Sequence, residues 1–244
     1  MSTLSIGLVL PDVLGTYGDD GNALVLRQRA RMRGIDAEIV TVHLGQAVPE
    51  HLDLYCLGGG EDTAQILAVE HLAKEKGLQR AVRNNAPVLA ICAGFQILGE
   101  SFRAGGKIID GLGLIDATTV SMQRRAIGEV RSTPALSELS EPLTGFENHM
   151  GATILGADAT ALGTVSKGIG NADAYAVEET GAPSEQKVAE GAIQGSVLGT
   201  YMHGPVLARN PELADLLLAR ALGTHLEPLD LPVVDQLRKE RLAQ

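Results

Sequence analysis

The sequence has no tryptophan and few aromatic residues, which make up only 3% of its 244 residues. Proteins that bind single-stranded nucleic acid stack the bases on aromatic side chains, so this scarcity argues against such a partner. Basic residues are also in the minority, with 20 Lys and Arg against 30 Asp and Glu, giving a formal net charge of −10. A nucleic acid or an anionic membrane surface would require a basic face. The low aromatic content and the negative net charge therefore argue against a nucleic acid partner, and the negative charge also argues against an anionic membrane.

Cysteine is scarce, and long apolar runs are absent. Two cysteines in 244 residues form no disulfide framework and no zinc site, and they indicate a reducing compartment such as the cytoplasm. The N-terminus has no basic segment followed by an apolar stretch, so we expect neither a signal peptide nor a membrane-spanning segment. What is present, 45% hydrophobic and 20% charged residues, is typical of a globular chain with a sizeable core. We expect one domain with an appendage.

Strands and helices alternate through the first hundred residues. The apolar runs that predict strands are Leu4–Leu10, Asp36–Val42, Leu52–Leu57 and Val88–Ile91. Helical periodicity covers Asn22–Arg33, closed by Gly34, and Asp62–Arg83, with a break near Lys76 and Gly77. Nearly continuous apolar strands that alternate with helices indicate a parallel sheet covered on both faces. The predicted fold class is therefore α/β, a three-layer αβα sandwich with a mostly parallel central sheet.

The pattern changes after Gly99. Gly105–Gly113 is a glycine-rich hairpin or loop, and Leu114–Gln194 is β-rich, with polar turns at 132–142, 156–160, 163–170 and 180–186. We expect this part to add antiparallel strands to the edge of the sheet and to carry functional loops. A late strand follows at Ser196–His203, then a helix at Asn210–Leu222, with Asn210 as its N-cap and Pro211 at its first position. Residues 233–242 predict an amphipathic helix, so we expect a main domain over 1–222 and a C-terminal helical tail over 223–244.

The stretch Pro87–Gly99 carries the strongest chemical signal. The buried strand Val88–Ile91 ends at Cys92, two small residues follow, and the apolar run Phe95–Leu98 then begins a helix. Strand, sharp turn, reactive side chain and helix form a nucleophile elbow, in which the positive end of the helix favours the thiolate. A free cysteine is more often simply buried. The flanking pattern here favours a nucleophile.

Other chemical features follow neighbouring strands, and the carboxyl ends of parallel strands share one edge of a sheet. They are the Asp- and Gly-rich loop Asp12–Asn22, the run Gly58–Asp62, and His203. His203 is suited to be the base for Cys92, with His149 as its rival. The run Gly58–Gly60 lacks the ending of a phosphate-binding loop and the spacing of a dinucleotide motif. It fits an oxyanion hole better, with backbone N–H groups near Cys92 and at Ala93 as donors.

Several of these segments together resemble the class I glutamine amidotransferases. Ala90–Gln96 resembles their nucleophile motif, and Gly58–Gly60 their oxyanion strand. Gly145–Gly151 and Gly199–Pro205 resemble the cobyric acid synthase-like branch of the class. Together with Tyr17–Asn22 and Leu26–Ala30, these segments resemble the glutaminase subunits (GatD) of lipid II isoglutaminyl synthases. The similarity covers nearly the whole chain and ends before the C-terminal tail. The fold that the resemblance implies is the flavodoxin-like class I glutaminase fold over residues 1–222.

The resemblance also implies roles for individual residues. Cys92 would attack the side-chain amide of glutamine and form a γ-glutamyl thioester, with His203 as general base and then acid. The backbones of Gly59 and Ala93 would form the oxyanion hole. Gln96 and Gly60 would lie beside the substrate. Arg125 matches the position that holds the carboxylate of free glutamine, although the pair Arg124 and Arg125 lies in a polar stretch that composition alone would leave as a solvated loop.

A partner is implied as well. Ammonia would pass to a Mur-ligase-like (MurT-type) subunit, which would use ATP and Mg²⁺ to amidate the α-carboxyl of D-glutamate in lipid II during peptidoglycan synthesis. No cofactor is expected in this chain. The family often has a Glu two residues after the His, but here that position is Pro205. Because an imidazole needs an orienting group, we expect an Asp of the partner to orient His203, so that hydrolysis depends on the complex.

Three alternatives stay open at this point. A cysteine peptidase or related hydrolase often carries His directly after the nucleophile, where this chain has Ala93. A cobyric or cobyrinic acid amidotransferase is usually fused to a nucleotide-binding synthetase domain. A non-catalytic flavodoxin-like binding module would tolerate the replacement of Cys92 by Ala, whereas an amidotransferase would lose its glutamine-dependent activity.

Overall fold

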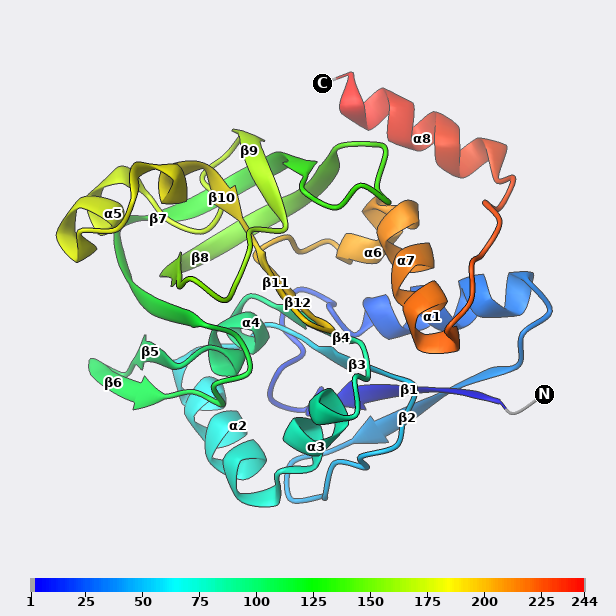
Figure 1. Cartoon of the computed structure of the whole chain (residues 1–244), viewed down its shortest axis with the longest axis horizontal. Helices are drawn as coiled ribbons and strands as arrows, with labels where there is room; N and C mark the ends of the chain where they lie inside the picture. The colour runs from blue at the N-terminus through cyan, green and yellow to red at the C-terminus, as the bar shows by residue number, and fades with distance from the viewer. Residues whose placement is uncertain (1–2, 244) are drawn as a thin grey trace.

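The computed structural model describes residues 3–243, which form two sheets and the helices around them (Figure 1). The central sheet has the order β11-β12-β4-β3-β1-β2. All neighbouring pairs are parallel except β11 with β12. The strands are β1 (Leu4–Val9), β2 (Ala37–Val42), β3 (Leu54–Leu57), β4 (Val88–Ile91), β11 (Ala192–Gln194) and β12 (Val197–Thr200). The predicted parallel sheet is confirmed.

Helices cover both faces of this sheet, as the alternating sequence pattern predicts (Figure 1). Two of them, α1 and α7, pack against each other on one face, and α2, α3 and α4 lie on the other. Strands β3 and β4 are buried along their whole length, which matches their uniformly apolar sequence. The helices are α1 (Gly21–Met32), α2 (Asp62–Glu75), α3 (Gly77–Arg83), α4 (Ala93–Leu98), α6 (Val206–Arg209) and α7 (Pro211–Leu222). The break predicted near Lys76 is present, since Lys76 has the left-handed φ of 58° between α2 and α3.

The β-rich part of the chain forms a second sheet, whereas the sequence predicted strands added to the edge of the first. Only β11 is such an edge strand. The second sheet consists of β5 (Ser101–Ala104), β6 (Lys107–Asp110), β7 (Ala117–Pro134), β8 (Leu143–Leu155), β9 (Gly163–Lys167) and β10 (Ala189–Glu190). Helix α5 (Ala174–Thr180) and the 3₁₀ turn Ser184–Val188 lie between β9 and β10. Some polar residues that the sequence predicted as turns lie within strands, because residues distant in the sequence pair with them. Ser132, for example, pairs with Leu143 of β8 and Val165 of β9.

Strands β7 and β8 form a long antiparallel pair with one irregularity that matters for the site. Their register shifts between Ser121 and Ala126, so the intervening residues of β7 are not paired with β8. A bulge of this kind bends a strand and redirects its side chains. Arg124 and Arg125 therefore lie on a bulge of a sheet, not on the flexible loop that composition suggested.

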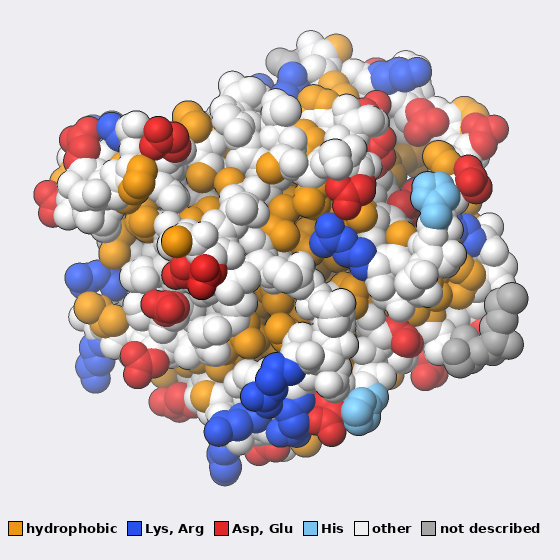
Figure 2. Space-filling view, in the orientation of Figure 1, with side chains coloured by type: hydrophobic (Ala, Val, Ile, Leu, Met, Phe, Trp, Pro, Cys, Tyr) orange, Lys and Arg blue, Asp and Glu red, His pale blue; other side chains and the backbone are white. Residues whose placement is uncertain are grey.

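The described helices include none that is both long and apolar enough to cross a membrane. On the face shown in Figure 2, acidic side chains are dispersed. Lys and Arg gather at its lower edge, over α2 and α3 in Figure 1. Lys74, Arg80 and Arg83 occupy the last turns of these two helices, where the helix dipole favours cations. This basic cluster therefore has a local structural explanation.

The C-terminal part of the chain follows the sequence prediction with one correction. Pro211 opens α7 as expected, and the tail forms α8 (Pro232–Leu242), whose Arg238 is buried and donates to the carbonyl of Pro142 over 2.6 Å. Asn210, however, does not cap α7 with its side chain. Its Oδ1 accepts the N–H of Thr144 (2.9 Å) and its Nδ2 donates to the Thr144 carbonyl (2.8 Å). Asn210 therefore joins β8 of the second sheet to the helical layer.

Replacing Asn210 by Ala should lower the free energy of unfolding by about 2–6 kcal/mol, because two buried backbone groups of Thr144 lose their partner at roughly 1–3 kcal/mol each. Urea denaturation measures the change. Asn84→Ala is the matched control, since Asn84 is exposed at the end of α3 and should change stability by less than about 0.5 kcal/mol. Equal stability of the two variants would contradict the proposed role of Asn210.

Candidate active site

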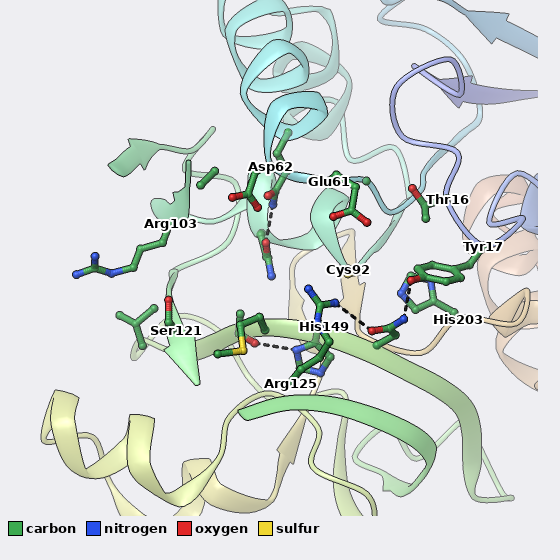
Figure 3. A pocket seen from close by; sticks show the side chains of 18 of the residues that line it. Thr16, Tyr17, Glu61, Asp62, Cys92, Arg103, Ser121, Arg125, His149 and His203 are labelled. Carbon is green, nitrogen blue, oxygen red and sulfur yellow. Dashed lines mark hydrogen bonds between the residues drawn. The ribbon is translucent and has the colours of Figure 1, made fainter. Parts of the chain in front are cut away.

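The segments that the sequence predicted at one edge of the sheet do line one cavity of about 330 Å³ (Figure 3). The loop after β1 contributes Thr16 and Tyr17, and Gly60 follows β3. Cys92 follows β4, and His203 follows β12. The opposite wall comes from β7 and β8 of the second sheet, with Ser121, Arg125, Asn148, His149 and Met150. The site therefore lies between the two sheets.

Cys92 occupies a strained turn, as an elbow requires. Its φ of 50° and ψ of −106° are unusual for a residue with a side chain, and α4 begins directly after it at Ala93. The N–H of Cys92 donates to the carbonyl of Thr200 over 2.8 Å, which fixes the turn to β12. Glycine is required at position 94, two residues after Cys92, because a Cβ there would lie 2.8 Å from the carbonyl oxygen of Gly58. The side chain of Cys92 is 9% exposed and borders the cavity.

The second cysteine, Cys56, has a different environment. It lies in β3, 2% exposed, and burial raises the pKa of its thiol to about 12. The thiolate is the attacking form of cysteine, so Cys56 is inert at neutral pH. Of the two cysteines, only Cys92 borders the cavity.

His203 is oriented by a carboxylate of this chain, Asp19. The Nδ1 atom of His203 lies 2.9 Å from Asp19 Oδ2 and 3.1 Å from Oδ1, and both side chains are buried. This leaves Nε2, which has no hydrogen-bond partner among residues 3–243. The expectation that His203 has no orienting carboxylate within this chain is therefore wrong, because Asp19 occupies that place. The dependence of hydrolysis on an Asp of the partner stays a prediction. The carboxylate comes from the loop after β1 and not from the segment after His203, where Pro205 stands at the family's carboxylate position.

The charge of Asp19 changes the protonation of His203. Burial disfavours the imidazolium, but the hydrogen bond and charge of Asp19, together with the neighbouring Cys92 sulfur, outweigh burial and raise the pKa of His203 from 6.5 to about 10. The ring is therefore protonated at neutral pH. It can hold the proton that the cysteine gives up, which is what a thiolate–imidazolium pair requires.

Gly59 lies between the two catalytic side chains. A Cβ at this position would lie 2.9 Å from His203 Cε1 and 3.5 Å from Cys92 Cβ, so only glycine fits. Its N–H donates to Asp19 Oδ2 over 3.0 Å. This corrects the prediction that the Gly59 N–H serves the oxyanion hole, since that donor already serves the carboxylate. Gly60, the next residue, borders the cavity.

Gln96 borders the cavity from α4, but both ends of its side-chain amide are hydrogen-bonded to other side chains of this chain. Its Oε1 accepts from Gln65 Nε2 (2.5 Å), and its Nε2 donates to the hydroxyl of Tyr201 (2.9 Å). The Tyr201 hydroxyl in turn shares a hydrogen bond of 2.6 Å with Thr153 Oγ1. Gln96 therefore forms a rigid part of the wall.

Arg125 reaches the cavity from the bulge of β7 (Figure 3). Its Nη1 donates to Asn148 Oδ1 over 3.0 Å, and Asn148 Nδ2 donates to the hydroxyl of Tyr17 over 2.5 Å. The rest of the guanidinium fork has no hydrogen bond to another of residues 3–243 and can meet an anion in the cavity. Arg124, its neighbour, does not line the cavity.

His149, the rival base, is held as a structural residue. Its ring stacks on Tyr201 with centroids 3.6 Å apart, and its Nδ1 bonds to the carbonyl of Gly151 over 2.8 Å. Its Nε2 lies 3.9 Å from a Glu147 oxygen, in the buried interior. The geometry therefore favours His203, which alone of the two contacts a close carboxylate and lies beside Cys92.

Sequence reasoning missed Asp19, Tyr17 and Asn148. The loop Asp12–Asn22 was recognised as a strand-end feature, but it holds three aspartates, Asp12, Asp19 and Asp20. Only Asp19 is buried, and only the folded loop distinguishes it from the others. Asn148 lay within a segment noted for its resemblance, with no role attached.

Comparison with known proteins shows the family to which the chain belongs. Residues 5–211 match the family model of the CobB/CobQ-like glutamine amidotransferase domain. The chain is 35% identical to the lipid II isoglutaminyl synthase (glutamine-hydrolyzing) subunit GatD of Streptococcus pneumoniae, over 99% of this chain and 89% of that protein. It is also 35% identical to the corresponding subunit of Staphylococcus aureus, over 95% and 90%. A cobyric acid synthase of Brucella anthropi is 33% identical over 69% of this chain but only 32% of its own length.

Solved structures share the fold. A crystal structure of a glutamine amidotransferase covers 88% of this chain and 98% of its own, with a TM-score of 0.56 and 19% identity. The glutaminase domain of Trypanosoma brucei CTPS, solved with bound acivicin, covers 92% and 96%, with a TM-score of 0.55 and 12% identity. At these identities the likeness establishes the architecture alone.

The protonation of His203 gives a testable pH dependence. Because its pKa in the folded chain, about 10, lies above the ordinary 6.5, the bound proton stabilises the fold fully below pH 6.5, and this contribution is lost as the pH rises toward 10. Asp19→Asn should lower the pKa of His203 by roughly 1–3 units and shift the decline in unfolding free energy to lower pH. NMR titration of the His203 ring and denaturation at several pH values measure both effects. Asp20→Asn, an exposed neighbour, is the matched control, and an equal change in both variants would refute the assignment.

Proposed function

Because the chain belongs to the CobB/CobQ-like glutamine amidotransferase family, we propose that it is the glutamine-hydrolysing subunit of a lipid II isoglutaminyl synthase. The observation that carries the proposal is similarity along nearly the whole of two GatD subunits, about nine-tenths of each. Similarity to the cobyric acid synthase of Brucella anthropi covers about a third of that protein. The product ammonia would be delivered to a Mur-ligase-like partner in the cytoplasm.

The first half of the proposed reaction forms a thioester. The Cys92 thiolate attacks the side-chain carbonyl carbon of glutamine, and the C–N bond breaks after a tetrahedral intermediate. The oxyanion of that intermediate would accept from the N–H groups of Ala93, at the start of α4, and of Gly60, which takes the place first assigned to Gly59. Each such donor contributes roughly 3–4 kcal/mol in the transition state. His203, protonated at neutral pH, gives its Nε2 proton to the leaving nitrogen, which departs as ammonia.

The second half hydrolyses the thioester. His203, now neutral, takes a proton from a water molecule, whose oxygen attacks the thioester carbon. The C–S bond breaks, glutamate leaves, and the thiolate–imidazolium pair is restored. Asp19 keeps Nδ1 protonated in both halves, so that Nε2 is the atom that gains and loses the proton. Arg125 binds the α-carboxylate of glutamine, and Gln96 forms the wall beside it.

No cofactor is proposed for this chain. The partner would bind ATP and Mg²⁺, activate the α-carboxyl of D-glutamate in the lipid II stem peptide as an acyl phosphate, and let ammonia displace the phosphate. D-isoglutamine is the product. The chemistry of this chain would thus end with ammonia.

Reconstitution with the candidate ligase tests the proposal. Cys92→Ala should lower glutamine-dependent amidation of lipid II by roughly 10⁴-fold or more, because the nucleophile is lost, while amidation driven by ammonium chloride continues at the wild-type rate. Mass spectrometry of the stem peptide measures both. Cys56→Ala is the matched control and should retain both activities, since Cys56 is buried in β3 and does not line the cavity. Glutamine-dependent amidation by Cys92→Ala, or amidation of a corrin substrate in place of lipid II, would refute the proposal.

The role of Arg125 gives a separate prediction. Arg125→Ala should raise the KM for glutamine by roughly 10–100-fold and leave kcat nearly unchanged, because a charged hydrogen-bonded pair contributes roughly 1.5–3 kcal/mol to binding. Steady-state glutamine hydrolysis measures it. Arg124→Ala, whose side chain does not line the cavity, should keep the wild-type KM. An unchanged KM in Arg125→Ala would remove the carboxylate-binding role.

A further inference from the structure

Tyr17 has a backbone conformation that calls for an explanation. Its φ is 62°, in the left-handed region, where a residue with a large side chain is strained. Gly18, next to it, has a φ of 73°, which glycine adopts without strain. The side chain of Tyr17 is 50% exposed, so burial in the core does not account for the choice of tyrosine. Strained residues cluster at functional sites, where the surrounding structure enforces them.

The loop around Tyr17 is fixed to the catalytic centre on both sides. Before it, the N–H of Thr16 donates to the carbonyl of Gly59 over 3.1 Å. After it, Asp19 binds His203 and the Gly59 N–H. The ring of Tyr17 therefore lies against His203, with centroids 4.9 Å apart and the planes tilted by 59°. The strained residue covers one side of the imidazole.

The hydroxyl of Tyr17 faces the other end of the cavity. It accepts a hydrogen bond of 2.5 Å from Asn148 Nδ2, and Asn148 Oδ1 accepts one of 3.0 Å from Arg125 Nη1 (Figure 3). A continuous bridge thus runs from the imidazole through Tyr17 and Asn148 to the guanidinium. It joins the loop after β1 to β7 and β8, so it also ties the first sheet to the second.

We propose that Tyr17 and Asn148 are positioning residues, which hold Arg125 ready for the carboxylate of the substrate and couple that carboxylate site to His203. Asn148 occupies one N–H of the guanidinium fork and fixes its plane, leaving the others for an anion. The same bridge holds the Tyr17 ring over the imidazole. This inference rests on the proposed function, because it takes glutamine as the molecule that Arg125 binds.

Each part of Tyr17 then has its own expected kinetic signature. Tyr17→Phe keeps the ring and removes the acceptor of the Asn148 bond, so the KM for glutamine should rise about 3–10-fold, the loss of one hydrogen bond, with kcat changed less than twofold. Tyr17→Ala removes the ring as well, so kcat should also fall and the pH profile of kcat should shift. Tyr17→Gly relieves the backbone strain, so it should match or exceed the wild type in stability while sharing the kinetic defect of Tyr17→Ala.

The closing experiment measures glutamine hydrolysis by the full chain, with and without the candidate ligase, for Tyr17→Phe, Asn148→Ala and the double variant. If the two residues act through one bridge, the double variant should show the KM of the worse single variant, not the product of the two effects. Tyr175→Phe is the matched control, because Tyr175 is 44% exposed on α5 and lies outside the cavity. It should behave as wild type.

Alkylation of Cys92 provides a second readout that does not depend on turnover. Tyr17→Phe should slow inactivation by 6-diazo-5-oxo-L-norleucine, which carries the α-carboxylate, but not by iodoacetamide, which has none. A wild-type KM in Tyr17→Phe, multiplicative effects in the double variant, or equal slowing by both reagents would overturn the bridge while leaving the proposed function intact. A wild-type chain that hydrolyses no glutamine under either condition would overturn both.

Discussion

The carboxylate of Asp19 is the constraint on which the catalytic end of the molecule depends. It accepts hydrogen bonds from His203 Nδ1 and from the Gly59 N–H, and so joins segments that follow three different strands of the sheet. A fully buried anion is costly unless a cation and hydrogen bonds compensate it. The imidazolium supplies that cation. The charged form of His203 therefore stabilises the fold as well as serving the chemistry, and the resting site is already protonated for the departure of ammonia.

The same region contains two non-glycine residues with left-handed backbones, Cys92 and Tyr17. Each such conformation costs of order 1–3 kcal/mol and persists only when its surroundings determine it. For Cys92 the surroundings are the Thr200 carbonyl on one side and the first turn of α4 on the other. For Tyr17 they are the bonds of its neighbours to Gly59 and to His203. The packed parallel sheet beneath, with β3 and β4 buried on both faces, supplies the stability that offsets this local strain.

The parts of the site that follow from short-range pattern could be predicted from the sequence. An apolar strand that ends in Cys92 and two small residues specifies an elbow locally, and the alternation of strands and helices places His203 at the same edge. Asp19 could not be found in this way, because Asp12, Asp19 and Asp20 share one loop and only the folded loop, in which Asp19 alone is buried, distinguishes them. Asn210 has the sequence signature of an N-cap, yet its bonds go to Thr144, 66 residues away. The lengths of β7 and β8 were underestimated from the sequence for the same reason, since their polar residues pair only with residues on the neighbouring strand.

The position of Asp19 also changes what a partner subunit would need to supply. Cys92, His203 and a carboxylate that orients the imidazole lie together within this one chain. Under the proposed function, coupling to the ligase can then act on another step. Ammonia that meets bulk water at neutral pH is protonated and is no longer a nucleophile, so its loss at the open side of the cavity is the step that a partner must prevent. That side carries Arg125, Met150 and the half-exposed ring of Tyr17. Under the proposed function, the residues that would bind glutamine and cover the imidazole thus also border the opening through which ammonia would be lost.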